Sequence, residues 1–208
     1  MLGLVGIKLG MTQMFDKEGN LIPVTVVECP PATVLAVKTK DGKDGYQAIK
    51  VASGAAKERL LSKAESGVFK KAGVAAAKHV AEFRLDDVKE YEVGKVLNVS
   101  IFEEGKKVTV TGVSKGKGFA GTIKRHKFNR GPETHGSQNV RQPGSIGAHT
   151  YPGRTFPGQR MAGHHGDKQT TYKNLGIVGI DAEKNLLFIR GAVPGAKSGK
   201  VIVRKQNG

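Results

Sequence analysis

The segment from Ser114 to Gly166 most constrains the fold of this chain, because it is too polar and too rich in glycine to form a core. Its 53 residues include eleven glycines, four prolines and only three Ile, Leu or Val residues. Such a segment buries too little apolar surface to offset the entropy lost when it becomes ordered. It has one acidic residue, Glu133, and nine basic residues: Lys115, Lys117, Lys124, Arg125, Lys127, Arg130, Arg141, Arg154 and Arg160. We therefore expect a partner of dense negative charge to order it, and nucleic acid is the obvious candidate.

The charge of the whole chain agrees with a polyanionic partner. Its net charge is +16 and its pI is about 10.0. Each Lys or Arg that meets a phosphate releases condensed counterions, so such a chain is suited to nucleic acid. No apolar run approaches the roughly 18 residues of a membrane span, and we expect a soluble cytoplasmic protein without a membrane partner. The single cysteine, Cys29, excludes an internal disulfide and a Cys-rich zinc site, and we expect a small, half-buried residue there.

Short β-rich segments on both sides of the basic segment predict an antiparallel barrel or sandwich. They are separated by turn signals such as Asp41-Gly42, and they share β-branched or alternating apolar residues. The predicted strands are residues 21–28, 33–40, 46–51, 96–101, 108–113, 175–180, 186–190 and 200–204.

A different pattern between Ala55 and Phe83 predicts one broken helix or two short ones. Leu60, Ala64, Val68 and Ala72 recur every four residues, with Leu61 and Phe69 beside them, as on one helical face. We therefore divide the chain into a globular β domain at 1–113 plus 167–208, with a helical insertion at about 55–85, and an extended basic loop at 114–166. A loop of that length without periodicity is typical of a functional extension.

Two local patterns offer other functions. Residues Gly116 to Gly121 spell G-x-G-x-x-G, but neither the hydrophobic helix nor the acidic residue of a dinucleotide site follows. Five of the six histidines lie in the basic segment, where metal ligation would require carboxylate or thiolate companions that are scarce. We expect no metal, no cofactor, no small-molecule substrate and no enzymatic activity. A nucleotide-binding enzyme and a free-standing RNA chaperone remain alternatives, to be tested by nucleotide binding and by sedimentation with ribosomal subunits.

Several motifs closely resemble those of the ribosomal protein L3 family of the bacterial large subunit. They run in order along the chain from Met1 to about Arg204: residues 6–12 (GIKLGMT), 22–26 (IPVTV), 114–122 (SKGKGFAGT), 143–147 (PGSIG), 161–163 (MAG) and 191–195 (GAVPG).

The resemblance implies a mainly β fold with some α structure. It implies a six-stranded antiparallel β-barrel of the type shared with translation factors, with a small helical insertion and a long irregular extension. It also implies a structural, primary binder of ribosomal RNA near the 3′ end of the large-subunit RNA. Such a protein nucleates assembly, contacts neighbouring ribosomal proteins and extends a loop towards the peptidyl transferase centre.

By position, the extension here is the basic segment. Its expected RNA contacts are the nine basic residues together with Lys168. Its expected tip, near the peptidyl transferase centre, consists of Gln142, Gly144, Ser145, Ile146, Gly147, His149, Thr150 and Tyr151. Some bacterial members have a methylated glutamine in this tip, but residues 148–151 here read Ala-His-Thr-Tyr, so we expect no such modification.

Overall fold

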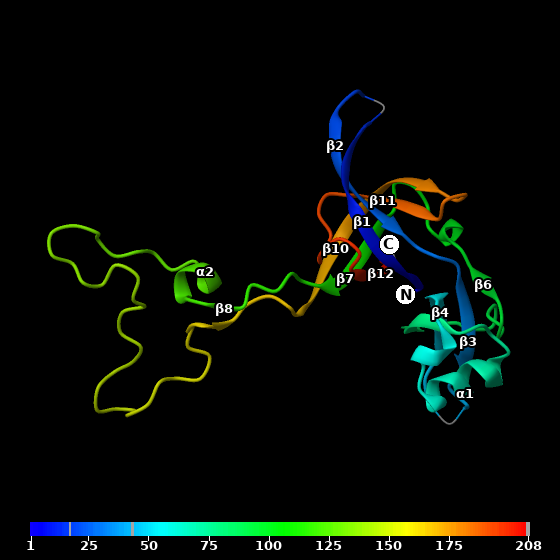
Figure 1. Ribbon diagram of the computed structural model, residues 1–208, viewed down its shortest axis with the longest axis horizontal. Coiled ribbons are helices and arrows are strands. Elements are labelled where there is room, and N and C mark those ends of the chain that lie inside the picture. The colour runs from blue at the N-terminus through cyan, green and yellow to red at the C-terminus, as the bar shows by residue number, and fades with distance from the viewer. Residues whose placement is uncertain (17, 43, 207–208) are drawn as a thin grey trace. The chain divides into compact units, whose positions relative to one another are not determined.

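The chain forms two units, and each is described by itself. The computed structural model describes residues 1–16, 18–42 and 44–206 (Figure 1). One unit comprises Met1–Ser114 together with the chain from Gln169 onward, and the other is Lys115–Lys168.

The larger unit is built on six strands that form a closed, fully antiparallel ring. Their order is β1-β12-β7-β10-β11-β2. The prediction of a mainly β chain is thereby confirmed. The strands are β1 (Gly3–Phe15), β2 (Leu21–Glu28), β7 (Lys107–Val113), β10 (Gln169–Asp181), β11 (Leu186–Arg190) and β12 (Lys200–Lys205).

Strand β1 closes the ring, and the sequence analysis assigned no strand there. Its first half pairs with β12, from Gly3 opposite Arg204 to Ile7 opposite Lys200, and its second half pairs with β2 as far as Phe15 opposite Leu21. Glycine at positions 3, 6 and 10 hides the strand pattern. Two of these glycines are required by packing. A Cβ at Gly3 would collide with the backbone oxygen of Val203, and one at Gly6 would lie 2.8 Å from the Cys29 Sγ.

Strands β5-β4-β3-β6 form a second antiparallel sheet in the same unit. They are β3 (Ala32–Lys38), β4 (Ala48–Ala55), β5 (Ala77–Arg84) and β6 (Val96–Leu97). The predicted helical insertion at 55–85 is therefore wrong over 77–84, where β5 pairs with β4 along its whole length and buries Phe83. The predicted strand at 96–101 is also mostly wrong, because β6 has only two residues and a 3-10 helix, η2 (Val99–Ile101), follows it.

Helical structure in the insertion is limited to a 3-10 helix, η1 (Glu58–Leu60), and the helix α1 (Lys63–Ala72). Ser62 and Glu65 form a reciprocal capping box at the start of α1, and Gly73 ends it in the left-handed conformation. The predicted apolar face is confirmed for Phe69, Leu61 and Ala72 but wrong for Leu60 and Val68, which are 75% and 42% exposed. Phe69 turns towards the second sheet and packs with Leu35, Ala52 and Ala77. One large aromatic ring offers more apolar area than several alanines, so it sets the orientation of the helix.

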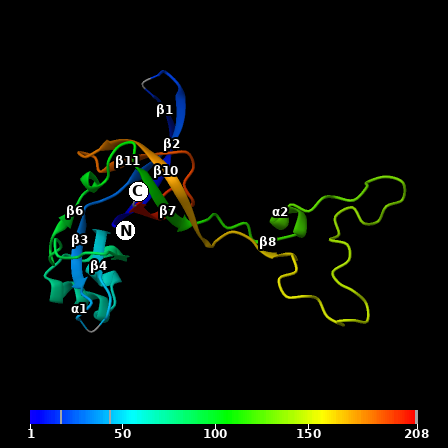
Figure 2. The ribbon, with the colours of Figure 1, turned by 180° about the vertical axis from the view of Figure 1, so that it is seen from behind.

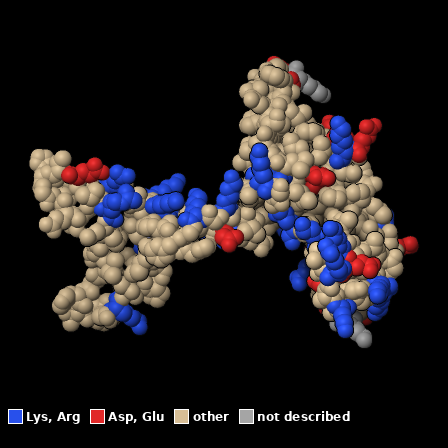
Figure 3. All heavy atoms as spheres, in the orientation of Figure 1, with Lys and Arg blue, Asp and Glu red and all other residues tan. Residues whose placement is uncertain are grey.

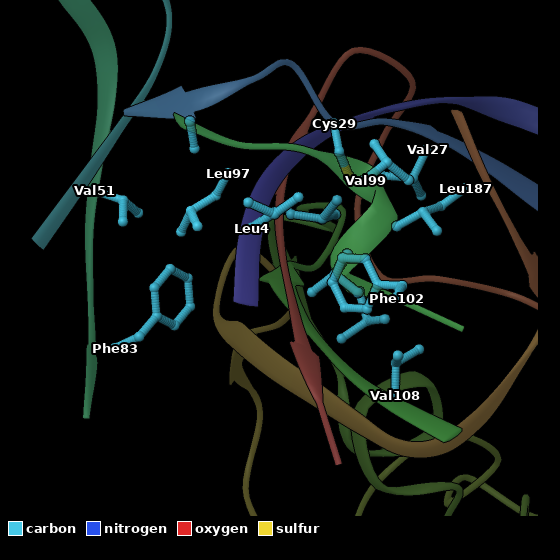
Figure 4. Packing of buried hydrophobic residues seen from close by; sticks show 14 of the residues in the cluster. Leu4, Val27, Cys29, Val51, Phe83, Leu97, Val99, Phe102, Val108 and Leu187 are labelled. Atoms are coloured by element: carbon cyan, nitrogen blue, oxygen red, sulfur yellow. The ribbon is translucent and has the colours of Figure 1, made fainter. Parts of the chain in front are cut away.

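A single core joins the ring and the second sheet (Figure 4). Leu4 of β1 lies between Phe83, Val51 and Leu97 on one side and Val99 and Phe102 on the other. Cys29 is fully buried in this core, not half-buried as predicted. Loss of solvent, with a smaller effect from Glu28, raises the pKa of its thiol to about 12, so the thiol stays protonated and unreactive.

Two side chains, one from β1 and one from β2, fix the loop 191–199 to the ring. The Lys8 Nζ donates to the carbonyl oxygens of Val193 (2.7 Å) and Gly195 (3.1 Å). The Thr25 hydroxyl donates to the carbonyl oxygen of Gly191 at 2.6 Å. Residues 6–12, 22–26 and 191–195, which the sequence analysis singled out as motifs, thus meet in space.

Two glycine-to-alanine substitutions should have opposite effects on stability. At Gly6 the added methyl group would lie 2.7 Å from the Val27 Cγ1 and 2.8 Å from the Glu28 backbone oxygen, so we expect destabilisation. Overpacking of this kind costs on the order of 1–3 kcal/mol. At Gly67, inside α1, an added Cβ meets nothing within 4 Å. Gly67→Ala should stabilise the protein by about 0.5–1 kcal/mol through helix propensity. Urea denaturation of both variants measures this, and an unchanged midpoint for Gly6→Ala would contradict the packing argument.

Candidate nucleic-acid interface

The smaller unit, Lys115–Lys168, begins and ends in two chain limbs that pair with each other. Strand β8 (Phe119–Ala120) pairs antiparallel with β9 (Gly163–His164). The pairing continues through the hydrogen bonds Lys117 N–H to His165 O (2.8 Å) and His165 N–H to Gly118 O (2.9 Å). Gly166 has a positive φ of 76°, and a Cβ there would collide with the Lys115 backbone oxygen. Only glycine therefore fits where the limbs approach each other.

A five-residue helix, α2 (Thr122–His126), follows β8 and packs onto the returning limb. The Arg125 guanidinium donates to the Met161 carbonyl oxygen at 2.7 Å, and the His126 Nε2 lies 3.0 Å from the same oxygen. A Cβ on Gly163 would meet Arg125 at 2.9 Å, so this glycine makes room for the guanidinium. Ala120 and Thr122 are buried beneath this contact. The segment predicted to be irregular throughout thus has a small folded base.

The folded base gathers four of the predicted RNA-binding cations around one imidazole. Partial burial is the largest cause that lowers the pKa of His165, and the charges of Lys117, Lys168, Arg125 and Lys124 lower it further. These four residues, here called the basic cluster, come from both limbs and from α2. Their sequence separation is too large for any local pattern to reveal the grouping. Like charges held this close repel one another, so the cluster favours an anionic partner.

Beyond the base, the chain from Asn129 to Arg160 is held only by local contacts. Within this stretch, which the structure describes in full, the hydrogen bonds join residues at most nine positions apart, as from Gly131 N–H to Val140 O at 3.0 Å. Figure 2 shows this part as a long irregular loop without helix or strand. Its shape is therefore set by turns and not by a core.

All eight predicted tip residues are exposed. They are Gln142, Gly144, Ser145, Ile146, Gly147, His149, Thr150 and Tyr151. The Tyr151 ring is 87% exposed and Ile146 is 45% exposed. The internal contacts are few: the Ser145 hydroxyl donates to the Gly147 carbonyl oxygen at 3.1 Å, and the His149 Nδ1 lies 3.1 Å from the Thr150 Oγ1. Aromatic rings this exposed are available for stacking on unpaired bases.

The smaller unit has many more Lys and Arg residues than Asp and Glu residues. Over the described residues, the one ion pair within Lys115–Lys168 joins Arg130 to Glu133 at 3.1 Å, and both side chains are more than half exposed. The remaining predicted contacts outside the basic cluster, Lys115, Lys127, Arg141, Arg154 and Arg160, are exposed. On the face seen in Figure 3, Lys and Arg (blue) on this unit far outnumber Asp and Glu (red). Phe119 and Phe156 add exposed aromatic surface at 81% and 61%.

The structure gives no support to a dinucleotide site at Gly116–Gly121. Strand β8 belongs to a two-stranded antiparallel ladder, and the helix after it has only five residues. A dinucleotide site needs a parallel sheet and a long helix whose N-terminus faces the pyrophosphate. In the part of the chain that the structure describes, no three His, Cys, Asp or Glu side chains are grouped so as to hold a metal ion. None of the described helices is long and apolar enough to cross a membrane.

The chain thus combines a mainly β unit with an exposed segment that is rich in Lys and Arg. The family described as ribosomal protein L3 matches residues 68–186. Similar proteins include large ribosomal subunit protein uL3 of Prochlorococcus marinus subsp. pastoris, which is 49% identical over 99% of this chain and 94% of its own length. Those of a Picosynechococcus species and Acetivibrio thermocellus are 51% and 49% identical over 97% of this chain, with 94% and 95% of their own lengths covered.

The chain belongs to the ribosomal protein L3 family. The resemblance identified from the motifs is thereby confirmed. This is a family of structural ribosomal proteins, so the prediction that the chain is not an enzyme is confirmed too.

Removing one charge of the basic cluster should raise the pKa of His165. In Lys117→Gln the repulsion from one neighbouring cation is lost, while the burial that contributes most to the lowered pKa remains. We therefore expect a rise that stops short of the ordinary histidine value. NMR titration of the His165 imidazole measures it, and Lys63→Gln in α1 is the control. An unchanged pKa in Lys117→Gln would contradict the grouping of these charges.

The lowered pKa of His165 makes the stability of this unit's folded base depend on pH. The folded-state pKa of His165 lies below the unfolded value of 6.5, so the unfolded chain binds the proton more tightly. The stabilising contribution of neutral His165 is present above the unfolded pKa and decreases as the pH falls below it.

Proposed function

We propose that this chain is a structural constituent of the large ribosomal subunit that binds ribosomal RNA through the unit Lys115–Lys168. The observation that carries the proposal is the set of exposed cations on a segment with one ion pair among its described residues. The relatives are named large ribosomal subunit proteins, which supports the same assignment.

Two parts of the unit would bind RNA in different ways. The basic cluster is held in place by the pairing of the two limbs and by the Arg125 contact to Met161, so it presents preorganised positive charge to phosphates. The loop from Asn129 to Arg160 has no core, so it would adopt its bound shape between RNA helices. Ordering such a loop costs conformational entropy, which the phosphate contacts must offset.

Recognition would depend on the shape of the RNA and on its unpaired bases. An arginine can bridge two phosphate oxygens or stack on a base, whereas a lysine acts as a point charge. The exposed rings of Phe119, Tyr151 and Phe156 suit stacking on splayed bases. Glycines such as Gly144 and Gly147 leave the backbone of the tip bare, so it can approach a strand closely.

The finer parts of this proposal follow from the family. The six-stranded ring is a barrel of the type shared with translation factors, and the barrel domain contacts neighbouring ribosomal proteins. The chain binds near the 3′ end of the large-subunit RNA and nucleates assembly. Its tip, from Gln142 to Tyr151, extends towards the peptidyl transferase centre, where it positions the RNA without reacting. The protein acts in the cytoplasm within the large subunit.

Neutralising two cations of the basic cluster should weaken RNA binding and flatten its salt dependence. Lys117 and Lys124 are exposed, and over the described residues neither forms an ion pair, so Lys117→Gln/Lys124→Gln leaves the fold intact. Each lost phosphate contact reduces the log–log salt slope by roughly 0.7–0.9. Filter binding to large-subunit RNA between low and high salt measures the slope. Lys63→Gln/Lys71→Gln in α1 has the same charge change and should leave the slope unaltered; equal slopes for both variants would refute the assignment.

Deleting the loop should leave folding of the larger unit intact but impair assembly of the ribosomal subunit. Replacing Arg130–Arg160 with a short Gly-Ser linker removes four of the predicted contacts and the whole tip but leaves the ring and its core unchanged. We expect a soluble, cooperatively unfolding protein that binds large-subunit RNA more weakly and yields defective subunits. Sucrose-gradient profiles of reconstituted subunits give the result, and normal affinity with normal assembly would rule the proposal out.

A further inference from the structure

The β1–β2 hairpin extends past the ring and presents an apolar face. Strand β12 pairs with β1 as far as Ile7, and β11 pairs with β2 only from Val24 to Glu28. From Gly10 to Phe15, β1 therefore has β2 as its one partner strand among the described residues. This two-stranded projection is visible at the top of Figure 1.

The register of the hairpin places its exposed apolar side chains on one face. Phe15 lies opposite Leu21 and Gln13 lies opposite Pro23, and cross-strand partners share a face. Met11 is two residues before Gln13, so it points the same way. Phe15 is 72% exposed, Leu21 55% and Met11 52%. On the opposite face, Met14 and Ile22 are half-buried. Met11, Gln13, Leu21 and Pro23, with Thr12, line a shallow groove of about 450 Å³.

The charge of the hairpin is opposite to that of the rest of the chain. Residues 9–27 contain two acidic residues, Asp16 and Glu18, and one basic residue, Lys17, while the whole chain carries +16. Asp16 is part of the turn, where it accepts hydrogen bonds from the backbone N–H groups of Glu18 and Asn20, both at 2.9 Å. These bonds, the one from Asn20 first, lower the pKa of its carboxyl group, so the tip stays negative.

The projecting half of β1 also lacks the usual protection of an edge strand. Natural proteins place lysine or proline on such edges to prevent pairing with other chains. Residues 10–15 of β1 contain neither, and they expose Met11 and Phe15 instead. An uncovered edge with this composition is a liability unless a partner covers it.

We propose that the face of the hairpin formed by Met11, Phe15, Leu21 and Pro23, here called the hairpin face, docks onto a neighbouring basic protein of the large subunit. The partner supplies an apolar patch for Phe15 and Leu21, and basic side chains at the rim for Asp16 and Glu18. RNA is a poor occupant, because the hairpin face offers apolar surface beside negative charge. A second copy of this chain is also a poor occupant, because its own hairpin would bring acidic tip against acidic tip. The proposal rests on the proposed incorporation into the large subunit.

A photocrosslinking experiment on assembled large subunits tests which molecule contacts the hairpin face. The full chain carrying benzoylphenylalanine at Phe15 replaces the wild-type protein in cells, and purified large subunits are irradiated. We expect one major adduct, identified by mass spectrometry as a basic ribosomal protein. The control places the same group at Leu60, which is 75% exposed in η1, and should not give that adduct. An adduct with RNA alone, an adduct between two copies of this chain, or no adduct overturns the proposal.

Two substitutions separate docking from folding. Phe15→Glu adds charge to the hairpin face and should reduce the crosslinked protein's occupancy in purified subunits at least tenfold, whereas Phe15→Leu should retain it. Unchanged occupancy in Phe15→Glu overturns the docking proposal. Sedimentation distinguishes the two levels of failure. A chain that migrates with large subunits but yields no protein adduct overturns the docking proposal alone, and a chain that never enters the subunit overturns the proposed function as well.

Discussion

The pairing of β1 with both β12 and β2 is the constraint on which the larger unit depends. It joins the first residues of the chain to the last strand, and it carries Leu4 into the centre of the core. Close approach of the backbones requires glycine at positions 3 and 6. Lys8 and Thr25 then tie the loop 191–199 to the same strands through carbonyl oxygens. Within the same unit, β7 ends where β10 begins, with Val113 opposite Gln169.

The smaller unit divides the work of binding between a fixed part and an adaptable part. Its base is held by the β8–β9 pairing and by the Arg125 contact to Met161, so the repulsion within the basic cluster is borne by local structure. The loop beyond it has short-range turns and bare glycines, so it can follow a surface that it does not define. The basic cluster holds its charges at fixed positions, and the flexible loop can extend to more distant parts of the partner. Together they suit a partner whose phosphates are dense and whose surface is irregular.

The cationic segment and the β1–β2 hairpin differ in charge, which indicates two kinds of contact within one chain. The segment Lys115–Lys168 concentrates cations, while the hairpin at Phe15 and Leu21 concentrates apolar surface beside Asp16. Phosphates are attracted to the first, whereas the second offers apolar surface and a net charge of −1 over residues 9–27, so the two surfaces suit different partners.

The sequence by itself determined the mainly β class, the positions of seven strands, the family and the concentration of Lys and Arg in residues 114–166, because composition, alternation and net charge are local properties of the chain. Only the tertiary structure decided the rest. It made residues 77–84 a strand through pairing with β4, left Val68 of the predicted helical face exposed, and formed β1 despite its glycines. It also brought Lys117, Lys124, Arg125 and Lys168 around His165. These outcomes depend on contacts between residues that are distant in the sequence, and the pattern within one segment does not specify which distant segment it will contact.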